Sequence, residues 1–307
     1  MQREPFTNLL TIDVEDYFQV HAFAGVVRPD QWNGFESRVE RNTHRILEIL
    51  DRTGTKATFF VLGWVADKVP GLVKTLVRLG HEVASHGYGH QHIAGQSPKE
   101  FREDVRRSKD VLEDVTGRPV YGYRAPTYSV SNKTLWALPI LAEEGFLYDS
   151  SIFPIRHDYY GIPSAPRQPF RIGVANGGTS RFDDLEIEPL LFQENDRIAL
   201  RSGELLEIPV ATFRLLGMNI PVVGGGYFRI LPYWIVKWGL KRINEEGGIF
   251  VFYLHPWEVD PDQPRVTGVP YRSRFRHYTN LDKTQRRLEK LVQDFSFVPI
   301  GSRISFQ

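Results

Sequence analysis

Short apolar segments, rich in β-branched and aromatic residues, recur along the chain and alternate with stretches whose apolar residues have helical spacing. Apolar side chains in consecutive positions over about four to eight residues are typical of strands buried on both faces of a parallel sheet. The predicted strands are Leu9–Val14, Ala57–Leu62, Glu82–Ser85, Val120–Arg124, Leu147–Ser150, Leu205–Val210, Ile249–His255 and Phe297–Ile300.

The stretches between these strands predict helices that each present one apolar side. These are Arg38–Asp51, Trp64–Leu79, a helix from Ser97-Pro98 to Gly117, Ser131–Glu144, Pro232–Glu246 and Leu281–Asp294. Such an alternation predicts an α/β fold with a parallel sheet and outer helices. With about seven or eight units in this length, a barrel is favoured over an open sheet.

Two stretches interrupt the alternation. Residues 154–204 are rich in Pro, Gly and Asp, and residues 256–278 are rich in Pro and Arg. We interpret both as long functional loops or a small β insertion within one domain that spans residues 1–307. Residues 154–230 as a whole are expected to form an insertion or lid over the barrel mouth.

Composition narrows the class of protein. The 307 residues are 41% hydrophobic and 24% charged with a net charge of +1, which excludes a polybasic nucleic-acid binder. Cysteine is absent, so any metal must be held by histidine and carboxylate groups. No apolar run reaches the length of a membrane span, and the N-terminal residues lack a signal-like apolar region, so we expect a cytoplasmic protein.

Carboxylates follow the first predicted strand, where Asp13, Glu15 and Asp16 lie within four residues. The third predicted strand is followed by His86, His90 and His92. In parallel βα folds, reactive groups gather at the carboxyl ends of strands. If the backbone after the third strand turns as a helix, the imidazoles of the first two of these histidines share one side. Two histidines and one carboxylate with open positions form a catalytic site for zinc or a similar divalent ion.

Three more polar residues come at the ends of predicted strands. Arg124 can pair with a carboxylate of the first strand and keep it ionised. His255 ends an otherwise apolar strand, and a buried partner such as Asp149 would raise its pKa. A structural salt bridge and a buried core histidine remain the simpler alternatives for Arg124 and His255.

In chain order, the strand-end Asp13, the His86–His90 pair, the RAP turn, YDSS and the Leu254-His255 strand end resemble the motifs of NodB-type polysaccharide deacetylases, carbohydrate esterase family 4. The longer segments LTIDVEDYFQVHAF, SHGYGHQH, FREDVRRSKDVLED, GYRAPTYSV, YDSSIFPIRHDYYGIP, GGGYFRILPY and FYLHPWEVDPDQP resemble the subfamily found with exosortase-linked exopolysaccharide gene clusters. The resemblance covers nearly the whole chain and implies a distorted seven-stranded (β/α) barrel.

The resemblance also implies roles for individual residues. It implies a divalent metal, usually Zn²⁺ although Co²⁺, Ni²⁺ or Fe²⁺ also suits the ligands, held by His86, His90 and one carboxylate. Val14 replaces the second of two adjacent aspartates in the common family pattern, so Glu15 or Asp16 supplies that carboxylate. The implied general base is Asp13, oriented by Arg124, the implied general acid is His255, and the backbone N–H near Thr127 is the implied oxyanion donor.

The implied reaction is removal of N-acetyl groups from hexosamine units of a polysaccharide or a lipid-linked oligosaccharide, in exopolysaccharide biosynthesis. The aromatic and guanidinium groups expected to contact sugar are Tyr128, Tyr227, Arg229 and Trp257. The expected partners are an N-acetylated glycan and, peripherally, membrane-bound polysaccharide synthesis machinery, with no nucleic acid. An allantoinase-like hydrolase of a small amide and an inactive glycan-binding module are the alternatives.

Overall fold

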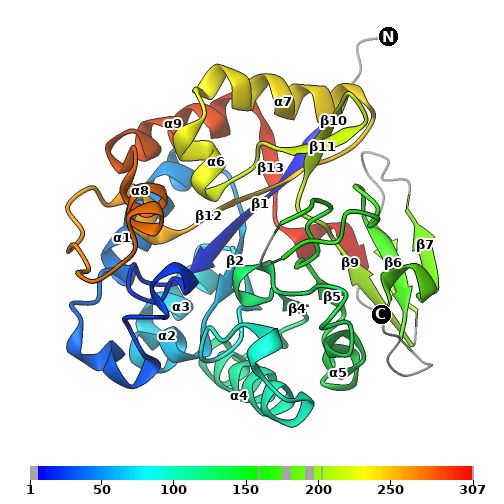
Figure 1. Cartoon of the computed structure of the whole chain (residues 1–307), viewed down its shortest axis with the longest axis horizontal. Helices are drawn as coiled ribbons and strands as arrows, with labels where there is room; N and C mark the ends of the chain where they lie inside the picture. The colour runs from blue at the N-terminus through cyan, green and yellow to red at the C-terminus, as the bar shows by residue number, and fades with distance from the viewer. Residues whose placement is uncertain (1–5, 158–159, 175–180, 191–196, 202, 306–307) are drawn as a thin grey trace.

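The computed structural model describes residues 6–157, 160–174, 181–190, 197–201 and 203–305. Within these residues, seven strands run parallel in the order β12-β1-β2-β3-β4-β5-β9 (Figure 1). The last of them in the chain lies beside the first, which is the cyclic order of a (β/α) barrel. The bounds are β1 Thr7–Val14, β2 Thr58–Val61, β3 Glu82–Ser85, β4 Gly122–Tyr123, β5 Tyr148–Asp149, β9 Glu204–Glu207 and β12 Val251–Leu254.

An eighth strand, β13 (Ser296–Val298), also pairs with β1, so every strand predicted from the sequence is present. The sheet is curled around a buried arginine. Arg124 follows β4 and Asp13 lies in β1, three strands away, yet Nη1 of Arg124 is 2.6 Å from Oδ1 of Asp13. In a flat sheet the two strands would be about 14 Å apart, which side chains standing perpendicular to the sheet cannot bridge. The predicted distorted barrel is confirmed.

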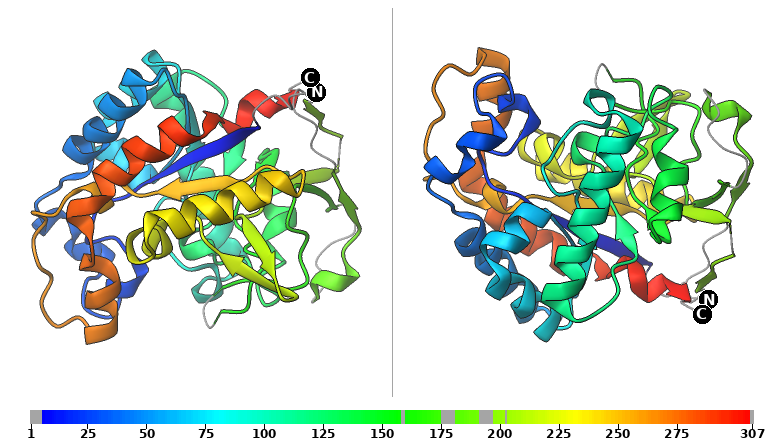
Figure 2. Two further views of the ribbon diagram at one scale, coloured as in Figure 1. Left: turned by 90° about the horizontal axis from the view of Figure 1, so that it is seen from above. Right: turned by 90° about the horizontal axis from the view of Figure 1, so that it is seen from below.

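Helices cover the outside of the sheet (Figure 2). They are α1 Val39–Arg52, α2 Gly63–Lys68, α3 Pro70–Arg78, α4 Pro98–Thr116, α5 Ala137–Glu143, α7 Tyr233–Glu245 and α9 Leu281–Asp294. The helix predicted over Trp64–Leu79 is two helices, because Pro70 lacks an amide N–H and starts a new one. The last predicted helix before β5 is shorter than expected and begins only at Ala137.

The chain between β5 and β12 forms strands that pair with several different partners. Strand β6 (Phe170–Gly173) pairs antiparallel with β9, and β7 (Ile187–Pro189) pairs antiparallel with β6. Strand β8 (Ile198–Ala199) instead pairs with β14 (Ile304–Ser305) near the C-terminus. The side chain of Gln168 bridges to β12, since its Oε1 accepts from the N–H of Ile249 at 3.2 Å. That residues 154–230 act as a lid stays a prediction.

A hairpin and further helices complete the structure. The hairpin consists of β10 (Thr212–Leu215) and β11 (Met218–Pro221), and α6 (Gly225–Ile230) follows it. The predicted loop 256–278 contains helix α8 (Tyr271–Tyr278). Short 3₁₀ turns are η1 His21–Phe23, η2 Pro29–Gly34, η3 Ile93–Gly95, η4 Pro126–Tyr128, η5 Phe182–Asp184, η6 Pro256–Val259 and η7 Ile300–Arg303. In the described part of the chain, none of the helices has the length and hydropathy of a membrane span.

The inside of the barrel changes character along its length. Toward the amino ends of the strands, apolar side chains fill it, including Leu9, Phe60, Ala84, Leu206 and Val251. Toward the carboxyl ends, the side chains that point inward are polar and nearly all buried, including Asp13, His86 and Arg124. Burying charged groups is costly unless they are paired, so this polar end of the barrel marks the candidate site.

Candidate active site

Glu15, His86 and His90 form the group in the described residues that is arranged to hold a metal ion. One ligand atom from each lies within 4.8 Å of the other two. Oε2 of Glu15 is 2.6 Å from Nε2 of His90, and the rings of the two histidines are 5.3 Å apart. Nδ1 of His86 is 2.8 Å from the carbonyl oxygen of Arg124, which leaves Nε2 of that ring for an ion.

The two histidines come together by a loop and not by the helical turn expected from their spacing. Gly87 has φ of 72° and His90 has φ of 49°, so this loop contains two residues in the left-handed region. Asp104 of α4 holds this loop, because its carboxylate accepts from the N–H groups of Tyr88 at 2.8 Å and Gly89 at 3.0 Å. His92 lies outside the group, and its Nδ1 accepts from the N–H of Ala94 at 3.2 Å.

Glu15 and Asp16, the two alternatives for the carboxylate ligand, point in different directions. Asp16 accepts from the N–H groups of Arg38 at 2.7 Å and Val39 at 3.1 Å and from the hydroxyl of Ser37 at 2.9 Å. It therefore caps the start of α1, where amide N–H groups have no partner within the helix. The structure places Glu15, and not Asp16, beside the two histidines.

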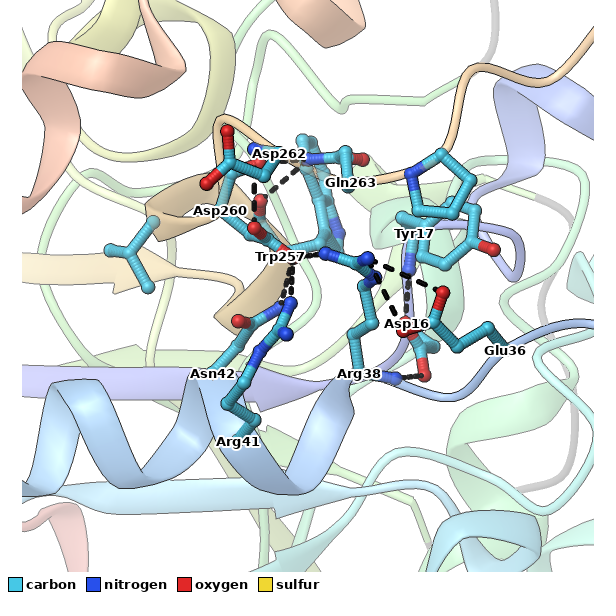
Figure 3. A network of polar contacts seen from close by, with 12 residues as sticks. Asp16, Tyr17, Glu36, Arg38, Arg41, Asn42, Trp257, Asp260, Asp262 and Gln263 are labelled. Atoms are coloured by element: carbon cyan, nitrogen blue, oxygen red, sulfur yellow. Dashed lines mark hydrogen bonds and ion pairs between the residues drawn. The ribbon is translucent and has the colours of Figure 1, made fainter.

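Figure 3 shows how the Asp16 end of α1 is joined to the loop after β12. Arg38 reaches from beside Asp16 to Asp260, with Nη1 3.2 Å from Oδ2. The same buried carboxylate accepts from Arg41 at 3.1 Å and Asn42 at 3.1 Å. The loops that carry Glu15 and His255 are thus braced against one helix.

Asp13 is held by Arg124, as the sequence predicted. Nη1 of Arg124 donates to Oδ1 of Asp13, and its Nε donates to the carbonyl oxygen of Ser150 at 3.0 Å. The guanidinium is fully buried and lies over the ring of Phe60 at 4.1 Å. One carboxylate oxygen of Asp13 is fixed in this way, and the other lies 3.8 Å from Nε2 of His255.

The sequence analysis suggested Asp149 as the partner of His255, but the structure pairs His255 with Glu258. Nδ1 of His255 is 2.7 Å from Oε1 of Glu258, and Asp149 has other partners. The carboxylate of Glu258 is in turn 2.6 Å from Nε of Arg229. Burial alone would lower the pKa of His255, but Glu15, Glu258 and Asp13 outweigh it and raise the pKa to about 9. The ring is therefore protonated at neutral pH, with Nε2 facing Asp13 and Glu15.

Sequence analysis missed Glu258, although a signal was present. It lies three residues after His255, at the end of the first turn of η6, where its carboxylate also accepts from the N–H of His255 at 3.0 Å. An acidic residue at this spacing from a strand-end residue is the pattern of a capping box, which brings its side chain back to the first residue.

Asp149 forms a buried acid pair with Glu207 of β9. Its carboxylate is hydrogen-bonded to that of Glu207 and accepts from the hydroxyl of Ser151. Burial raises the pKa of both groups, and the neighbouring Asp149 raises the pKa of Glu207 further. The pair therefore holds a proton near neutral pH. It lies behind Ser150, whose oxygens accept from Arg124, and so supports the arginine and not His255.

Two residues predicted to contact sugar are buried beneath the site. Trp257 donates from Nε1 to Oε1 of Glu15 at 3.1 Å, and its ring stacks on those of His255 and His277. Arg229 is 2% exposed and donates to the carbonyl oxygens of His277 and Thr279 as well as to Glu258. Direct contact with a ligand does not fit Arg229, and we propose a positioning role for it.

Three tyrosines pack together beside Arg124. Tyr128 packs against Tyr253 with ring centroids 5.0 Å apart and against Tyr160 at 6.3 Å. Its hydroxyl is buried without a hydrogen-bond partner in the described residues. Tyr227 of α6 is partly exposed and hydrogen-bonded to Tyr160. Asp158 and Tyr159, in the segment YDSSIFPIRHDYYGIP, lie outside the described residues.

The turn after Arg124 has an unusual backbone conformation. Thr127 has φ of 57° and Tyr128 φ of 53°, both left-handed, which is unusual for residues other than glycine. The N–H of Tyr128 is occupied by the carbonyl oxygen of Ala125 at 3.0 Å. Backbone strain of this kind is often found at functional sites.

Electrostatics suit a bound cation at Glu15 and the two histidines. Burial tends to raise the pKa of Glu15, but the neighbouring His90, His255 and His86 outweigh it and lower the pKa, so the carboxylate is ionised. Burial lowers the pKa of His86 to about 4, so its ring is neutral at neutral pH. A neutral imidazole and an ionised carboxylate are the forms that bind divalent metals.

Family models match two separate parts of the chain. The polysaccharide deacetylase model matches residues 30–142, which include His86, His90 and Arg124. A domain of unknown function, DUF3473, matches residues 188–304, which include Arg229, His255 and Glu258. The two histidines of the candidate metal group thus lie in the deacetylase match, whereas His255 and Glu258 lie in the DUF3473 match.

Curated relatives match over part of the chain. The chain is 34% identical over 110 residues to a peptidoglycan deacetylase-like protein of Gibberella zeae, an alignment that covers 35% of this chain and 32% of the relative. It is 32% identical over 108 residues to a peptidoglycan deacetylase of Helicobacter pylori, covering 35% and 36%. A peptidoglycan-N-acetylglucosamine deacetylase of Bacillus cereus is 35% identical over 86 residues, covering 26% and 31%. The chain thus spans about a third of the length of the curated relatives it matches.

Similarity to a solved structure extends over the whole chain. A Mycobacterium smegmatis protein, provisionally described as a polysaccharide deacetylase, aligns with 100% of this chain and 96% of its own, with a TM-score of 0.53 and 20% identity. At this identity the likeness concerns the fold, which the two proteins share.

Proposed function

We propose, from the premise that this chain contains a polysaccharide deacetylase domain, that it is a metal-dependent hydrolase of N-acetyl groups on hexosamine units of a glycan. The observation that carries the proposal is that two groups of side chains meet at the carboxyl ends of the barrel strands. Glu15, His86 and His90 are arranged as ligands, and Asp13 and His255 lie beside them as a base and an acid.

The residues present fit a divalent ion. The three ligand groups are nearly buried, lie within 4.8 Å of one another and offer two nitrogens and one carboxylate, the donor set of catalytic zinc sites. A bound ion would polarise the acetyl carbonyl and make the attacking water more acidic. Co²⁺, Ni²⁺ and Fe²⁺ suit the same donors, and we propose Zn²⁺ as the first metal to test.

Asp13 is placed to accept the proton of the attacking water. Arg124 holds one of its carboxylate oxygens, so the other has a fixed direction toward the space between Glu15 and His255. A base that is held by a second group loses less freedom on reaching the geometry of proton transfer.

His255 is placed to protonate the leaving amine. An amide nitrogen leaves poorly as an anion, so a proton must reach it as the C–N bond breaks. Nε2 of His255 faces the site, while Nδ1 is held by Glu258, which stabilises the protonated ring. Arg229 fixes Glu258 from behind, which makes Glu258 and Arg229 positioning residues.

The developing oxyanion and the sugar rings would meet the turn after Arg124. We propose that the N–H of Thr127 contributes to the oxyanion site, because that of Tyr128 is already used. Tyr128, Tyr160 and Tyr227 offer ring faces and hydroxyls beside the site, which suit the faces of sugars. We propose an exopolysaccharide or a lipid-linked oligosaccharide as the glycan.

The test is acetate release from a panel of N-acetylglucosamine oligosaccharides by the zinc-loaded protein. The account predicts acetate together with an equal amount of new free amine. The matched control is Glu15→Gln, which should release none. A protein that holds zinc but releases no acetate from any member of the panel, and instead hydrolyses a small cyclic amide, would contradict the proposal.

A further inference from the structure

Large apolar side chains are exposed on the β10–β11 hairpin and on α7. Leu216 is 89% exposed, Trp234 71% and Met218 59%, and Leu215 and Trp238 are nearly half exposed. We call these five residues the hairpin–α7 surface. Single exposed apolar residues are ordinary, but a cluster of this size indicates an interaction site.

The β10–β11 hairpin packs beside α7, as Figures 1 and 2 show. The rings of Phe213 and Trp238 are 5.2 Å apart, edge to face. Leu215 and Met218 are paired in the hairpin and share the face of Phe213, since side chains two apart in a strand point the same way. Trp234 and Trp238 lie one turn apart on the same side of α7.

The tip of the hairpin is unfavourable for a folded protein in water. Leu216 has φ of 49° and Gly217 has φ of 81°, so the turn needs two left-handed residues. Asn, Asp or Gly normally occupies such positions, whereas leucine is strained there. Leucine at this position thus combines backbone strain with exposed apolar surface. Departures from local preference that nothing in the fold offsets point to a role outside the fold.

Two basic side chains beside the surface have no ion-pair partner among the described residues. The hairpin and α7 carry Arg214, Lys237, Lys241 and Arg242. Nζ of Lys237 is 2.6 Å from Oδ1 of Asp294, and Nε of Arg242 is 3.4 Å from Oε1 of Glu246. The side chains of Arg214 and Lys241 make no ion pair or hydrogen bond within the described part of the chain, so their charges are open to a partner.

We propose that the hairpin–α7 surface docks on an anionic lipid bilayer. Tryptophan beside basic residues is typical of helices that lie in the membrane interface, with the rings at the level of the headgroups. A protruding leucine at a hairpin tip can enter the acyl region, while the neighbouring basic side chains meet anionic headgroups. The surface would hold the enzyme on a membrane.

Vesicle binding tests this proposal and needs no substrate. The full-length protein is mixed with vesicles of phosphatidylcholine alone, or with phosphatidylglycerol replacing part of it, and the bound fraction is measured by cosedimentation. Wild type should bind the anionic vesicles and bind the neutral ones weakly. Leu216→Asp should lower the affinity at least about tenfold, because it removes the burial of one leucine. Arg214→Gln and Lys241→Gln should each lower it about fivefold on anionic vesicles only.

Tyr271→Asp, at a residue 79% exposed on α8, is the matched control and should bind as wild type does. The thermal unfolding midpoint of each variant shows whether it has folded. Absence of binding by wild type to either vesicle, or an equal loss in Tyr271→Asp and Leu216→Asp, would overturn the proposal. So would a wild-type dimer in sedimentation equilibrium that Leu216→Asp converts to a monomer, since the surface would then contact a second copy.

Discussion

Nδ1 of His255 lies 2.7 Å from Oε1 of Glu258, and this contact fixes both the direction of the ring and its charge. Burial would favour a neutral imidazole, yet Glu15, Glu258 and Asp13 raise the pKa of His255 from 6.5 to about 9. A group with a raised pKa keeps its proton until the pH approaches the new value, so the acid form persists through neutral pH.

Glu258→Gln should therefore narrow the pH range of activity from its alkaline side. The neutral amide no longer stabilises the protonated ring, so the pKa of His255 moves down from about 9 toward 6.5. The alkaline limb of kcat/KM against pH, measured on an N-acetylated oligosaccharide, should shift down with it. Glu245→Gln, at an exposed glutamate of α7, is the control and should leave the limb in place. An unshifted limb in Glu258→Gln would show that Glu258 does not set the proton affinity of His255.

Asp13→Asn and His255→Ala should differ by substrate. Loss of a general acid or base typically costs about 10²–10⁴ in rate. An activated phenyl acetate has a leaving group that needs little protonation, so His255→Ala should retain far more activity on this ester than on an N-acetyl sugar. Asp13→Asn should lose activity on both. Equal losses on both substrates in His255→Ala would place His255 outside the proton transfer to the leaving group.

Substitutions of Tyr227 and Arg229 should have different kinetic effects. Tyr227 is partly exposed among the tyrosines beside the site, so Tyr227→Ala should lower turnover of a long oligosaccharide more than that of a small acetate ester. Arg229 is buried against Glu258, so Arg229→Gln should shift the alkaline limb as Glu258→Gln does. Kinetics of both variants on both substrates would separate these effects. If Arg229→Gln changed only the KM for the oligosaccharide, the sequence-based assignment of this residue to sugar binding would be restored.

The Asp149–Glu207 pair should make stability depend on pH. Burial raises the pKa of Asp149 above 3.8, so the folded state binds more protons than the unfolded state as the pH rises from about that value. The contribution to the free energy of unfolding is fully present below pH 3.8 and is lost as the pH passes the raised pKa. Glu207→Gln can donate to Asp149 and should flatten this loss in denaturant titrations between acid and neutral pH. Parallel curves for wild type and Glu207→Gln would mean that the pair shares no proton.

The sequence predicted the barrel because buried parallel strands such as Thr58–Val61 and Val251–Leu254 are apolar throughout. It also predicted which strand ends carry the polar side chains that the structure brings together. The order of these groups around the barrel follows from the βα alternation and does not depend on side-chain detail.

What the sequence left open depended on local backbone direction. Whether Glu15 or Asp16 faces the histidines is decided by the turn at the end of β1, which sends Asp16 to the start of α1. The pairing of His86 with His90 depends on two left-handed residues that spacing cannot reveal. Arg229 was assigned to sugar because its contact with Glu258 joins residues 29 positions apart in the chain. Glu258 was missed although its spacing from His255 is local.

The measurement that tests the central claim most directly is the zinc content of Glu15→Gln and Asp16→Asn. Each protein is loaded with zinc, dialysed and measured by elemental mass spectrometry, with wild type beside them. The account predicts one zinc per wild-type chain and per Asp16→Asn chain, because Asp16 only caps α1. It predicts little zinc in Glu15→Gln, which lacks the carboxylate next to His86 and His90. A full complement of zinc in Glu15→Gln together with its loss from a folded Asp16→Asn would contradict the account.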